Sequence, residues 1–284
     1  MNTKLRQSGL TLTELAVVIA VMALLAGLAL PAARMIIGSF ESGDGARSMI
    51  SAALASARAL AAARDSYVGI RFQKAYNPDA VDPLNPLTAP QYMIFIEKDA
   101  DPEPNGTGLA NGFRAIEGCK PIKLPDSIGV MDLTLVARST TLTEEAIDTD
   151  AQIDTLEELR DTTTFSIIFS PSGKLLIHEV RIRNRNGRMD SSSARSLDDV
   201  FNTKAQVDAG IAIFYQDDYW GAAWSGFPNL GLGPEYSRNS FVIYDRDKFA
   251  RAYKAGKAWS DYLAALTAET IYLNPYTGTI ISKD

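Results

Sequence analysis

The sequence predicts an α+β fold, in which one long N-terminal helix packs on a mostly antiparallel β-sheet or sandwich. Two observations predict the helix: an uncharged apolar run at residues 15–33, and an alanine-rich amphipathic segment at residues 47–64. A third observation predicts the sheet, because apolar and polar residues alternate in short segments after Asp65. With 284 residues, the chain is long enough for one large domain or two modest ones.

The composition excludes some classes of function. A net charge of −6 argues against a surface that binds nucleic acid as a whole, since neutralising phosphates requires basic patches. Cys119 is the only cysteine, so the chain cannot form an intramolecular disulfide or a cysteine metal cluster. The fold must therefore be held together by its own hydrophobic core.

The N-terminal segment has the length of a membrane span. As a helix, the nineteen residues 15–33 would measure roughly 29 Å, close to the ~30 Å of a bilayer core. Lys4 and Arg6 precede the run and predict a cytoplasmic N-terminus, with the rest of the chain across the membrane. A removable signal peptide and a plain anchor are the alternatives. Neither explains Glu14, a costly charge at the start of an apolar helix.

The segment GLTLTEL at residues 9–15 resembles the type III signal of type IV pilins and type II secretion pseudopilins. The resemblance implies cleavage between Gly9 and Leu10, followed by methylation of the new amine of Leu10. Glu14 is then the fifth mature residue and Pro31 the twenty-second, where the family carries a glutamate and often a proline. Two mature residues depart from the family pattern: Leu10 replaces the usual phenylalanine, and Thr13 replaces the usual aliphatic residue.

The resemblance also implies how such a chain assembles. The Glu14 carboxylate would pair with the Leu10 amine of a neighbouring subunit, which offsets the cost of burying either charge in hydrocarbon. The implied partners are the prepilin peptidase and methyltransferase, other pseudopilin or pilin subunits, the inner-membrane assembly platform and the membrane. The implied location is a single pass of the inner membrane, with a periplasmic or extracellular C-terminal domain, before incorporation into a filament.

The amphipathic segment at residues 47–64 is expected to continue the N-terminal helix onto the sheet. Pro31 is expected to kink the helix, and Gly38, Gly43 and Gly45 indicate a flexible or partly unwound stretch before residue 47. Helical periodicity predicts a buried face made of Ile50, Leu54, Ala57, Leu60 and Ala61.

Strand signals follow the helix. Alternation predicts strands at residues 67–72, 91–96, 112–116 and 128–136. The clearest hairpin pairs residues 164–169 with residues 174–182 across the turn Ser-Pro-Ser-Gly at 170–173.

The order of the later motifs narrows the resemblance. KLPDSIGV at residues 123–130 and FSPSG at residues 169–173 are similar to segments of the H-type minor pseudopilins and their FimT-like pilin relatives. We therefore expect a leader at 1–9, a transmembrane polymerisation helix at 10–33, its amphipathic continuation at 34–66, a pseudopilin β-domain at 67–185, and a C-terminal extension of the same globular head at 186–284. Within this extension we expect a strand at 240–244, a helix at 247–265 and a last strand at 270–281.

An arginine ladder is the one candidate site for nucleic acid. Arg181, Arg183 and Arg185 alternate along an expected strand and so share one face, with Arg188 just beyond a turn. Such a ladder could bind DNA phosphates in a minor pilin for DNA uptake. It could equally pair with carboxylates of this acidic protein or with a neighbouring subunit.

The other candidate residues form no pattern that would predict a catalytic site, a cofactor site or a metal site. The acidic residues between Asp99 and Asn105 lack the final glutamate of a calcium loop, and the acidic run 144–161 has no recognised ligand spacing. His178 stands alone on an expected strand, without a nucleophile motif. The aromatic residues Tyr215, Tyr219, Trp220 and Trp224 are expected to pack in the core or in a subunit interface.

The sequence therefore predicts a minor pseudopilin or pilin subunit of a protein-secretion or pilus-like filament, and no enzyme. Two alternatives are a DNA-binding minor pilin and an exported soluble binding protein with a conventional signal peptide.

Overall fold

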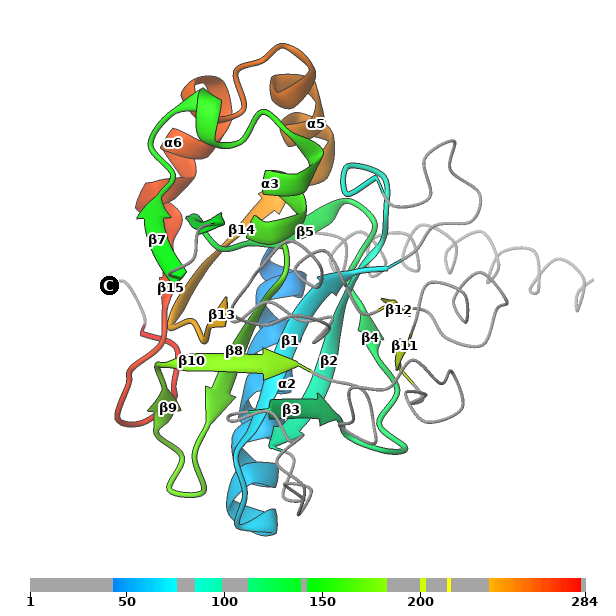
Figure 1. Cartoon of the computed structure of the whole chain (residues 1–284), viewed down its shortest axis with the longest axis vertical. Helices are drawn as coiled ribbons and strands as arrows, with labels where there is room; N and C mark the ends of the chain where they lie inside the picture. Colours follow the sequence, from blue (N-terminus) through cyan, green and yellow to red (C-terminus); the bar gives the residue numbers. More distant parts are fainter. Residues whose placement is uncertain are drawn as a thin grey trace, which may run out of the picture.

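The protein has an α+β fold, with one long helix packed against mostly antiparallel sheets (Figure 1). The computed structural model describes residues 43–75, 85–98, 112–138, 142–182, 200–202, 214–215 and 235–281. The expected transmembrane helix lies outside these residues. The α+β prediction is thus confirmed for the part of the chain that can be seen.

Helix α2 (Gly43–Arg64) is the long helix of this fold. Its first turn carries Asp44 and its last turn Arg64, which complement the helix dipole at each end. Gly43 and Gly45 belong to the helix, so the expected unwinding there is wrong for these two glycines. The helix ends before Asp65, which takes a left-handed conformation with φ of 48° and turns the chain toward the sheet.

The predicted buried face of α2 is confirmed at four of its five positions. Ile50, Leu54, Ala57 and Ala61 are buried, and the fifth, Leu60, is partly buried against the same cluster. Ala46 and Ala53 complete the face. Since four of these six buried side chains are alanines, the helix axis can approach the sheet closely.

The main sheet is centred on β1 (Val68–Lys74), which pairs antiparallel with β2 (Gln91–Lys98) on one side and β8 (Phe165–Phe169) on the other. Gly69 of β1 allows close approach to β8, because a Cβ there would lie 2.4 Å from the carbonyl oxygen of Ile167. The strand order is β13-β10-β3-β2-β1-β8-β9, and β4 pairs with β2 off this path. The remaining members are β3 (Gly112–Ala115), β4 (Ile122–Lys123), β9 (Leu175–Leu176), β10 (Glu179–Ile182) and β13 (Glu235–Tyr236).

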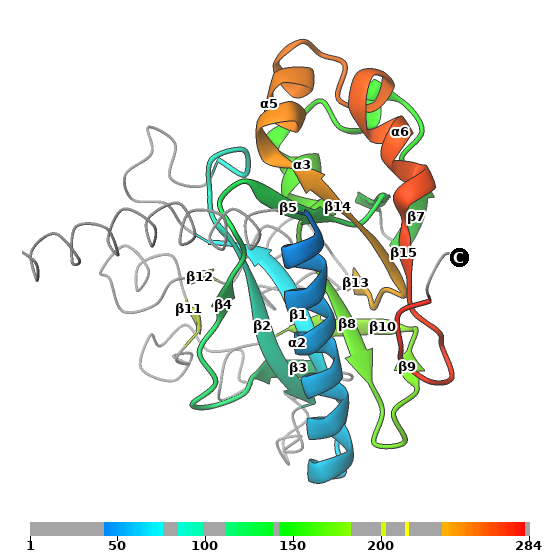
Figure 2. The same ribbon diagram turned by 180° about the vertical axis from the view of Figure 1, so that it is seen from behind.

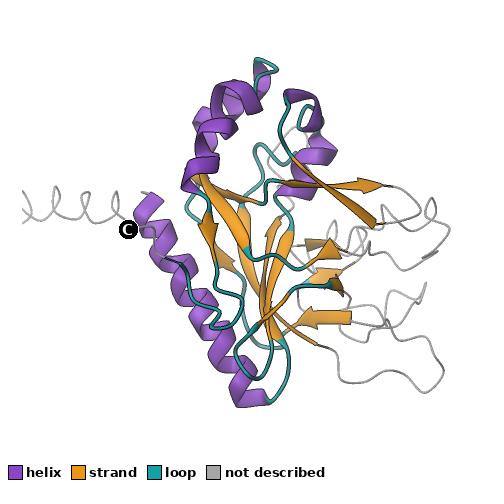
Figure 3. Ribbon diagram, turned by 90° about the vertical axis from the view of Figure 1, so that its left-hand side faces the viewer, coloured by secondary structure: helices purple, strands orange, loops and turns teal. Residues whose placement is uncertain are grey.

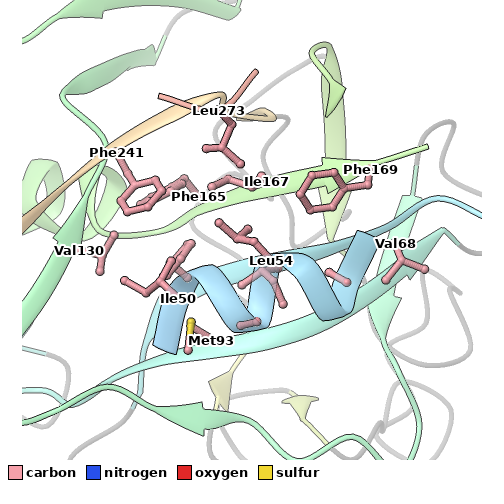
Figure 4. Close-up of a cluster of buried hydrophobic side chains, with 14 of the residues drawn as sticks. Ile50, Leu54, Val68, Met93, Val130, Phe165, Ile167, Phe169, Phe241 and Leu273 are labelled. Carbon is pink, nitrogen blue, oxygen red and sulfur yellow. The ribbon is translucent and has the colours of Figure 1, made fainter. Parts of the chain in front are cut away.

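Both faces of the main sheet are covered by apolar side chains. On one face, Ile50 and Leu54 of α2 pack with Phe165 and Ile167 of β8 (Figure 4). On the other face, Ile94 of β2 belongs to a second cluster that includes residues of two short strands, β11 (Phe201–Asn202) and β12 (Phe214–Tyr215). Figure 3 shows α2 as an outer layer beside the strands.

A smaller sheet, in the order β15-β14-β5, closes the α2 side of the core. Its strands are β5 (Ile128–Met131), β14 (Ser240–Asp245) and β15 (Ile271–Tyr272). The predicted strand at residues 128–136 is therefore wrong as a single strand. The chain breaks at the buried Asp132, and β6 (Thr134–Arg138) leaves to pair with β7 (Leu142–Ala146) in a separate hairpin.

A third apolar cluster organises a helical lobe, which we define as residues 133–138, 142–162 and 246–269. Figure 1 shows this lobe above the sheets. Phe249 and Leu263 lie at its centre, together with Leu159 and with Tyr244 from β14. The lobe contains β6, β7, the 3₁₀ turns η1 (Asp150–Gln152) and η3 (Thr267–Glu269), α3 (Leu156–Thr162), α5 (Arg246–Lys254), the π-helical turn η2 (Trp259–Leu263) and α6 (Ala264–Leu266).

Three further predicted elements are corrected. The expected second strand of the hairpin, at residues 174–182, is split: β9 pairs with β8, whereas β10 pairs with β3 in parallel. The helix expected at 247–265 is interrupted after α5 at Gly256, whose φ of 69° suits glycine. The last strand, expected at 270–281, is a short hairpin in which only Leu273 and Ile280 bridge beyond β15.

Candidate assembly surface

The free face of α2 is the candidate functional surface of the described residues. In Figure 2 the helix lies in front of the main sheet and runs along the outside of the fold. Its exposed central positions hold only small side chains without charge: Ser48, Ser51, Ala52, Ala55, Ser56, Ala59, Ala62 and Ala63. We call these eight residues the small-residue face. Exposed charges occur at its ends, at Asp44, Arg47 and Arg64.

The small-residue face is suited to close packing by another helix. Serine and alanine keep side chains short, so a neighbouring helix can approach the backbone closely. The Ser56 hydroxyl donates to the carbonyl of Ala52 at 2.8 Å, so it has a partner within its own helix. The face is exposed and carries no carboxylate, imidazole or thiol that would bind a metal. Its chemistry is that of a packing surface.

The C-terminal end of α2 is fixed to the sheet by charged groups. Arg64 contacts Glu97 of β2, with Nη1 2.5 Å from Oε2, and Arg114 of β3 contacts the other carboxylate oxygen at 3.4 Å. Nearer the middle, the Arg58 side chain lies against Gly173 in the turn between β8 and β9, where a Cβ would come within 2.8 Å of its Nε. These contacts hold the helix rigidly against the sheet and leave its other face free.

The residues predicted to act in processing and assembly all lie outside the described residues. This applies to Gly9, Leu10, Glu14 and Pro31. In the part of the chain that the structure describes, no helix is both long and apolar enough to cross a membrane. The structure therefore does not test the roles predicted for these four residues, and each stays a prediction.

Of the arginine ladder, the structure describes only the first residue, Arg181. The backbone of Arg181 lies in β10 and is in register with Gly112 of β3. Arg183, Arg185 and Arg188 lie outside the described residues. The shared face of the ladder thus stays a prediction.

The acidic segments serve local structure where they are described. Asp150 accepts hydrogen bonds from the backbone of Trp259 (2.7 Å) and Ser260 (3.0 Å), and hydrogen bonding by Ser260 lowers the pKa of Asp150. Glu158 and Thr155 form the capping box of α3. Across the described ranges, no group of three or more His, Cys, Asp or Glu side chains is arranged to hold a metal ion. The segment between Asp99 and Asn105 is outside them.

His178 and the backbone of Tyr215 are the parts of the two remaining candidate groups that the structure describes. His178 is exposed, and its backbone nitrogen and carbonyl both lie 3.3 Å from the hydroxyl of the buried Ser237. Four aromatic residues were expected to pack in the core or in a subunit interface. Tyr215 contributes its backbone to β12, and the other three are outside the described residues.

Sequence reasoning missed a buried polar clamp at Gln91. This side chain is 1% exposed; its amide nitrogen donates to the carbonyls of Val130 and Thr163, both at 2.8 Å, and its oxygen accepts from the nitrogen of Val130 at 2.8 Å. Gln91 thereby joins β2 of the main sheet to β5 of the smaller sheet. Only the position of a glutamine at the start of an apolar strand hinted at it.

A buried charge cluster was also missed. Arg238 pairs with Asp132 and with Glu144, the latter at 2.5 Å, and so ties the loop before β14 to the β6–β7 hairpin. Thr134 donates to Asp132 at 3.1 Å. Burial raises the pKa of Asp132 to about 6, although the positive charge of Arg238 opposes the rise. The partners are about a hundred residues apart, which is why periodicity could not reveal them.

The chain was compared with family models, curated proteins and solved structures, and none of these matches it.

Proposed function

We propose that this protein is a minor pseudopilin or pilin subunit, assembled through its N-terminal helix into a type II secretion pseudopilus or a pilus-like filament. The observation that carries the proposal is the spacing of Gly9, Glu14 and Pro31 around an apolar run of membrane length. The spacing from Gly9 to Glu14 and the spacing from Gly9 to Pro31 agree independently with cleavage after Gly9. An ordinary signal peptide or anchor requires neither spacing.

The proposed mechanism gives each N-terminal residue a task. A prepilin peptidase cleaves after Gly9, and the amine of Leu10 is methylated, which retains its positive charge. Glu14 of an incoming subunit pairs with that amine in a neighbour, because neither charge is stable alone in hydrocarbon. The pairing sets the axial register of one subunit against the next.

The fold supports this proposal through α2. A subunit that polymerises by its N-terminal helix needs one face of that helix to carry the globular head. The opposite face must meet the neighbouring subunits. The buried alanine-rich face of α2 meets the first need, and the small-residue face is suited to the second.

The test is processing in cells that contain a prepilin peptidase. Mass spectrometry of the purified chain should find a mature N-terminus at Leu10, carrying one methyl group. A mature start after Ala33, or an uncleaved chain in the presence of active peptidase, would refute the proposal.

A second measurement isolates assembly from processing. The variant Glu14→Ala should still be cleaved but should be depleted from sheared filaments, because its amine-pairing carboxylate is gone. Glu145→Ala, at an exposed position of β7, is the matched control and should assemble normally. Equal incorporation of the two variants would remove the assigned role of Glu14.

A further inference from the structure

Large apolar side chains gather at one exposed corner of the fold. Among the described residues, the exposed large hydrophobic side chains are Ile177 (52%), Tyr272 (48%), Tyr276 (76%) and Ile281 (48%). Three of them belong to the C-terminal hairpin, residues 271–281, and the fourth directly follows β9. In Figures 1 and 2 this hairpin, drawn in red, lies beside β9. We call these four side chains the C-terminal corner.

Alternation along the hairpin turns two of these side chains outward. Leu273 and Ile280 form a bridge, and both pack against the core beneath α2. Tyr272 and Ile281 are the next residues along the two strands, and the nitrogen of Ile281 donates to the carbonyl of Tyr272 at 2.8 Å. Because successive residues of a strand point to opposite faces, Tyr272 and Ile281 lie side by side on the outer face.

Hydrogen bonds hold the turn of the hairpin, so Tyr276 is presented in a fixed position. The side chain of Asn274 accepts from the nitrogens of Tyr276 (2.9 Å) and Thr277 (3.2 Å). The carbonyl of Pro275 accepts from the nitrogen of Leu175 in β9 at 2.9 Å, which fastens the turn to the edge of the main sheet. The C-terminal corner is therefore ordered before it meets a partner, which lowers the entropic cost of binding.

The size of the C-terminal corner decides what kind of partner can cover it. Its exposed apolar area is on the order of 400 Å², a size at which the largest patch of a monomer is often functional. A stable complex between free molecules needs about 800 Å² per partner, so the corner alone cannot hold a partner that diffuses freely. Its partner must already be kept close by another contact.

The position of the C-terminal corner argues against the bilayer as that partner. A Cβ on Gly278 of the hairpin turn would lie 2.8 Å from the carbonyl of Gly173, and a Cβ on Gly173 would lie 2.8 Å from Nε of Arg58. The turn is thus level with Arg58 of α2, about 22 Å along the helix axis from Gly43. In the proposed function the membrane-spanning segment precedes Gly43 and α2 leads away from it, so the corner faces the space between subunits.

A second copy of the chain meets the requirements of size and position. This step rests on the proposed function, in which an N-terminal helix anchors every copy in one bilayer with the same orientation. A twofold axis along the membrane normal then brings two identical corners to the same height. The four side chains carry no charge, so the corner does not repel its own copy. We propose that the C-terminal corner is the contact between two membrane-anchored copies of this subunit before they enter a filament.

The test is cysteine crosslinking of the full chain in native membranes of cells that lack a prepilin peptidase. Thr277→Cys, in a Cys119→Ser background, places a single thiol beside Tyr276 and keeps the four apolar side chains. Oxidation by copper phenanthroline should give a disulfide-linked homodimer. Ala255→Cys in the same background is the matched control, since Ala255 is an exposed residue of the helical lobe, and it should stay monomeric.

Adding Tyr276→Glu to the Thr277→Cys chain should lower the yield of dimer about tenfold, because like charges then face each other across the contact. Tyr276 is exposed, so an unchanged Tm should show that the fold is intact. The inference is overturned if the two cysteine variants crosslink equally, if Tyr276→Glu has no effect, or if the thiol links to a different protein in place of a second copy.

These outcomes are distinguishable from failure of the proposed function. The crosslinking cells contain no peptidase, so the yield of dimer is independent of cleavage after Gly9. A chain that is correctly processed but forms no homodimer overturns the further inference alone. A mature start after Ala33 refutes the proposed function, and it overturns the inference as well because the anchor is then absent.

Discussion

At the scale of single residues, two buried polar side chains join parts of the fold that backbone pairing leaves separate. Gln91 of β2 forms three hydrogen bonds, to Val130 of β5 and to Thr163 at the end of α3. Arg238 joins two carboxylates from a distant part of the chain. Burying such groups costs free energy unless every partner is present. Each is therefore a point at which one substitution should have a large effect.

Replacing Gln91 by leucine should lower the free energy of unfolding by about 2–4 kcal/mol. The leucine leaves the nitrogen and carbonyl of Val130 and the carbonyl of Thr163 without their side-chain partner in a buried region. Urea unfolding of the two proteins measures the difference. Gln73→Leu is the control on the neighbouring strand, because Gln73 is only partly buried and accepts one side-chain bond, from Arg71. Equal losses in the two variants would show that Gln91 has no special role.

Asp132 should make stability depend on pH in an unusual direction. Its pKa is raised to about 6 in the folded protein, from 3.8 for a free carboxyl, so between these values the folded chain holds a proton that the unfolded chain releases. Stability from this group is then fully present below about pH 4 and is lost as pH rises through 6. The loss is at most about 3 kcal/mol, the free-energy equivalent of this shift in pKa.

The variant Asp132→Asn isolates this contribution. Asparagine keeps an oxygen for the bond from Thr134 and cannot ionise, while Glu144 remains to pair with Arg238. Unfolding by urea at several values between pH 4 and 7.5 should show the wild type losing stability relative to the variant as pH rises. Other groups titrate alike in both proteins and cancel. A difference that is independent of pH would mean that Asp132 is already ionised in this whole range.

At the scale of elements, sequence periodicity predicted helices and strands that depend on one segment, and it missed contacts between distant segments. The buried face of α2 and the positions of β1, β2 and β8 follow from spacing within one segment, and the structure confirms them. The break at Asp132 does not follow from local spacing, because Asp132 pairs with Arg238, about a hundred residues later in the chain. The parallel pairing of β10 with β3 was equally invisible, since alternation identifies a strand but not its partner.

The candidate surface shows the same division. The small-residue face could be read directly from the helical spacing of serine and alanine once the buried face was known. The clamp at Gln91 could not be predicted in this way, because it needs strands and loops from distant parts of the chain to meet at one place. The N-terminal processing signal is the opposite case. It is recognised from linear spacing alone and needs no folded context.

At the scale of the whole molecule, the described C-terminal segment, residues 235–281, contributes to the core beneath α2. β14 pairs with β5 and contributes Phe241 to the cluster beneath α2, while β15 and the bridge at Leu273 close the same cluster. The packing that fixes α2 thus depends on both ends of the described chain. With its inner face committed in this way, α2 leaves the small-residue face as its exposed side, which is the surface that the proposed function assigns to subunit contact.

Enlarging one side chain of that face should impair assembly and leave the head intact. Ala55→Leu keeps the helix propensity high and changes an exposed position, so the free energy of unfolding should move by no more than about 0.5 kcal/mol. If a neighbouring helix packs there, the amount of the variant in sheared filaments should fall about tenfold, the equivalent of roughly 1.4 kcal/mol of lost contact. Ala265→Leu makes the same change at an exposed position of α6 and should assemble normally. Should both variants enter filaments at the wild-type level, the small-residue face does not touch its neighbours, and subunit contacts must lie elsewhere in the chain.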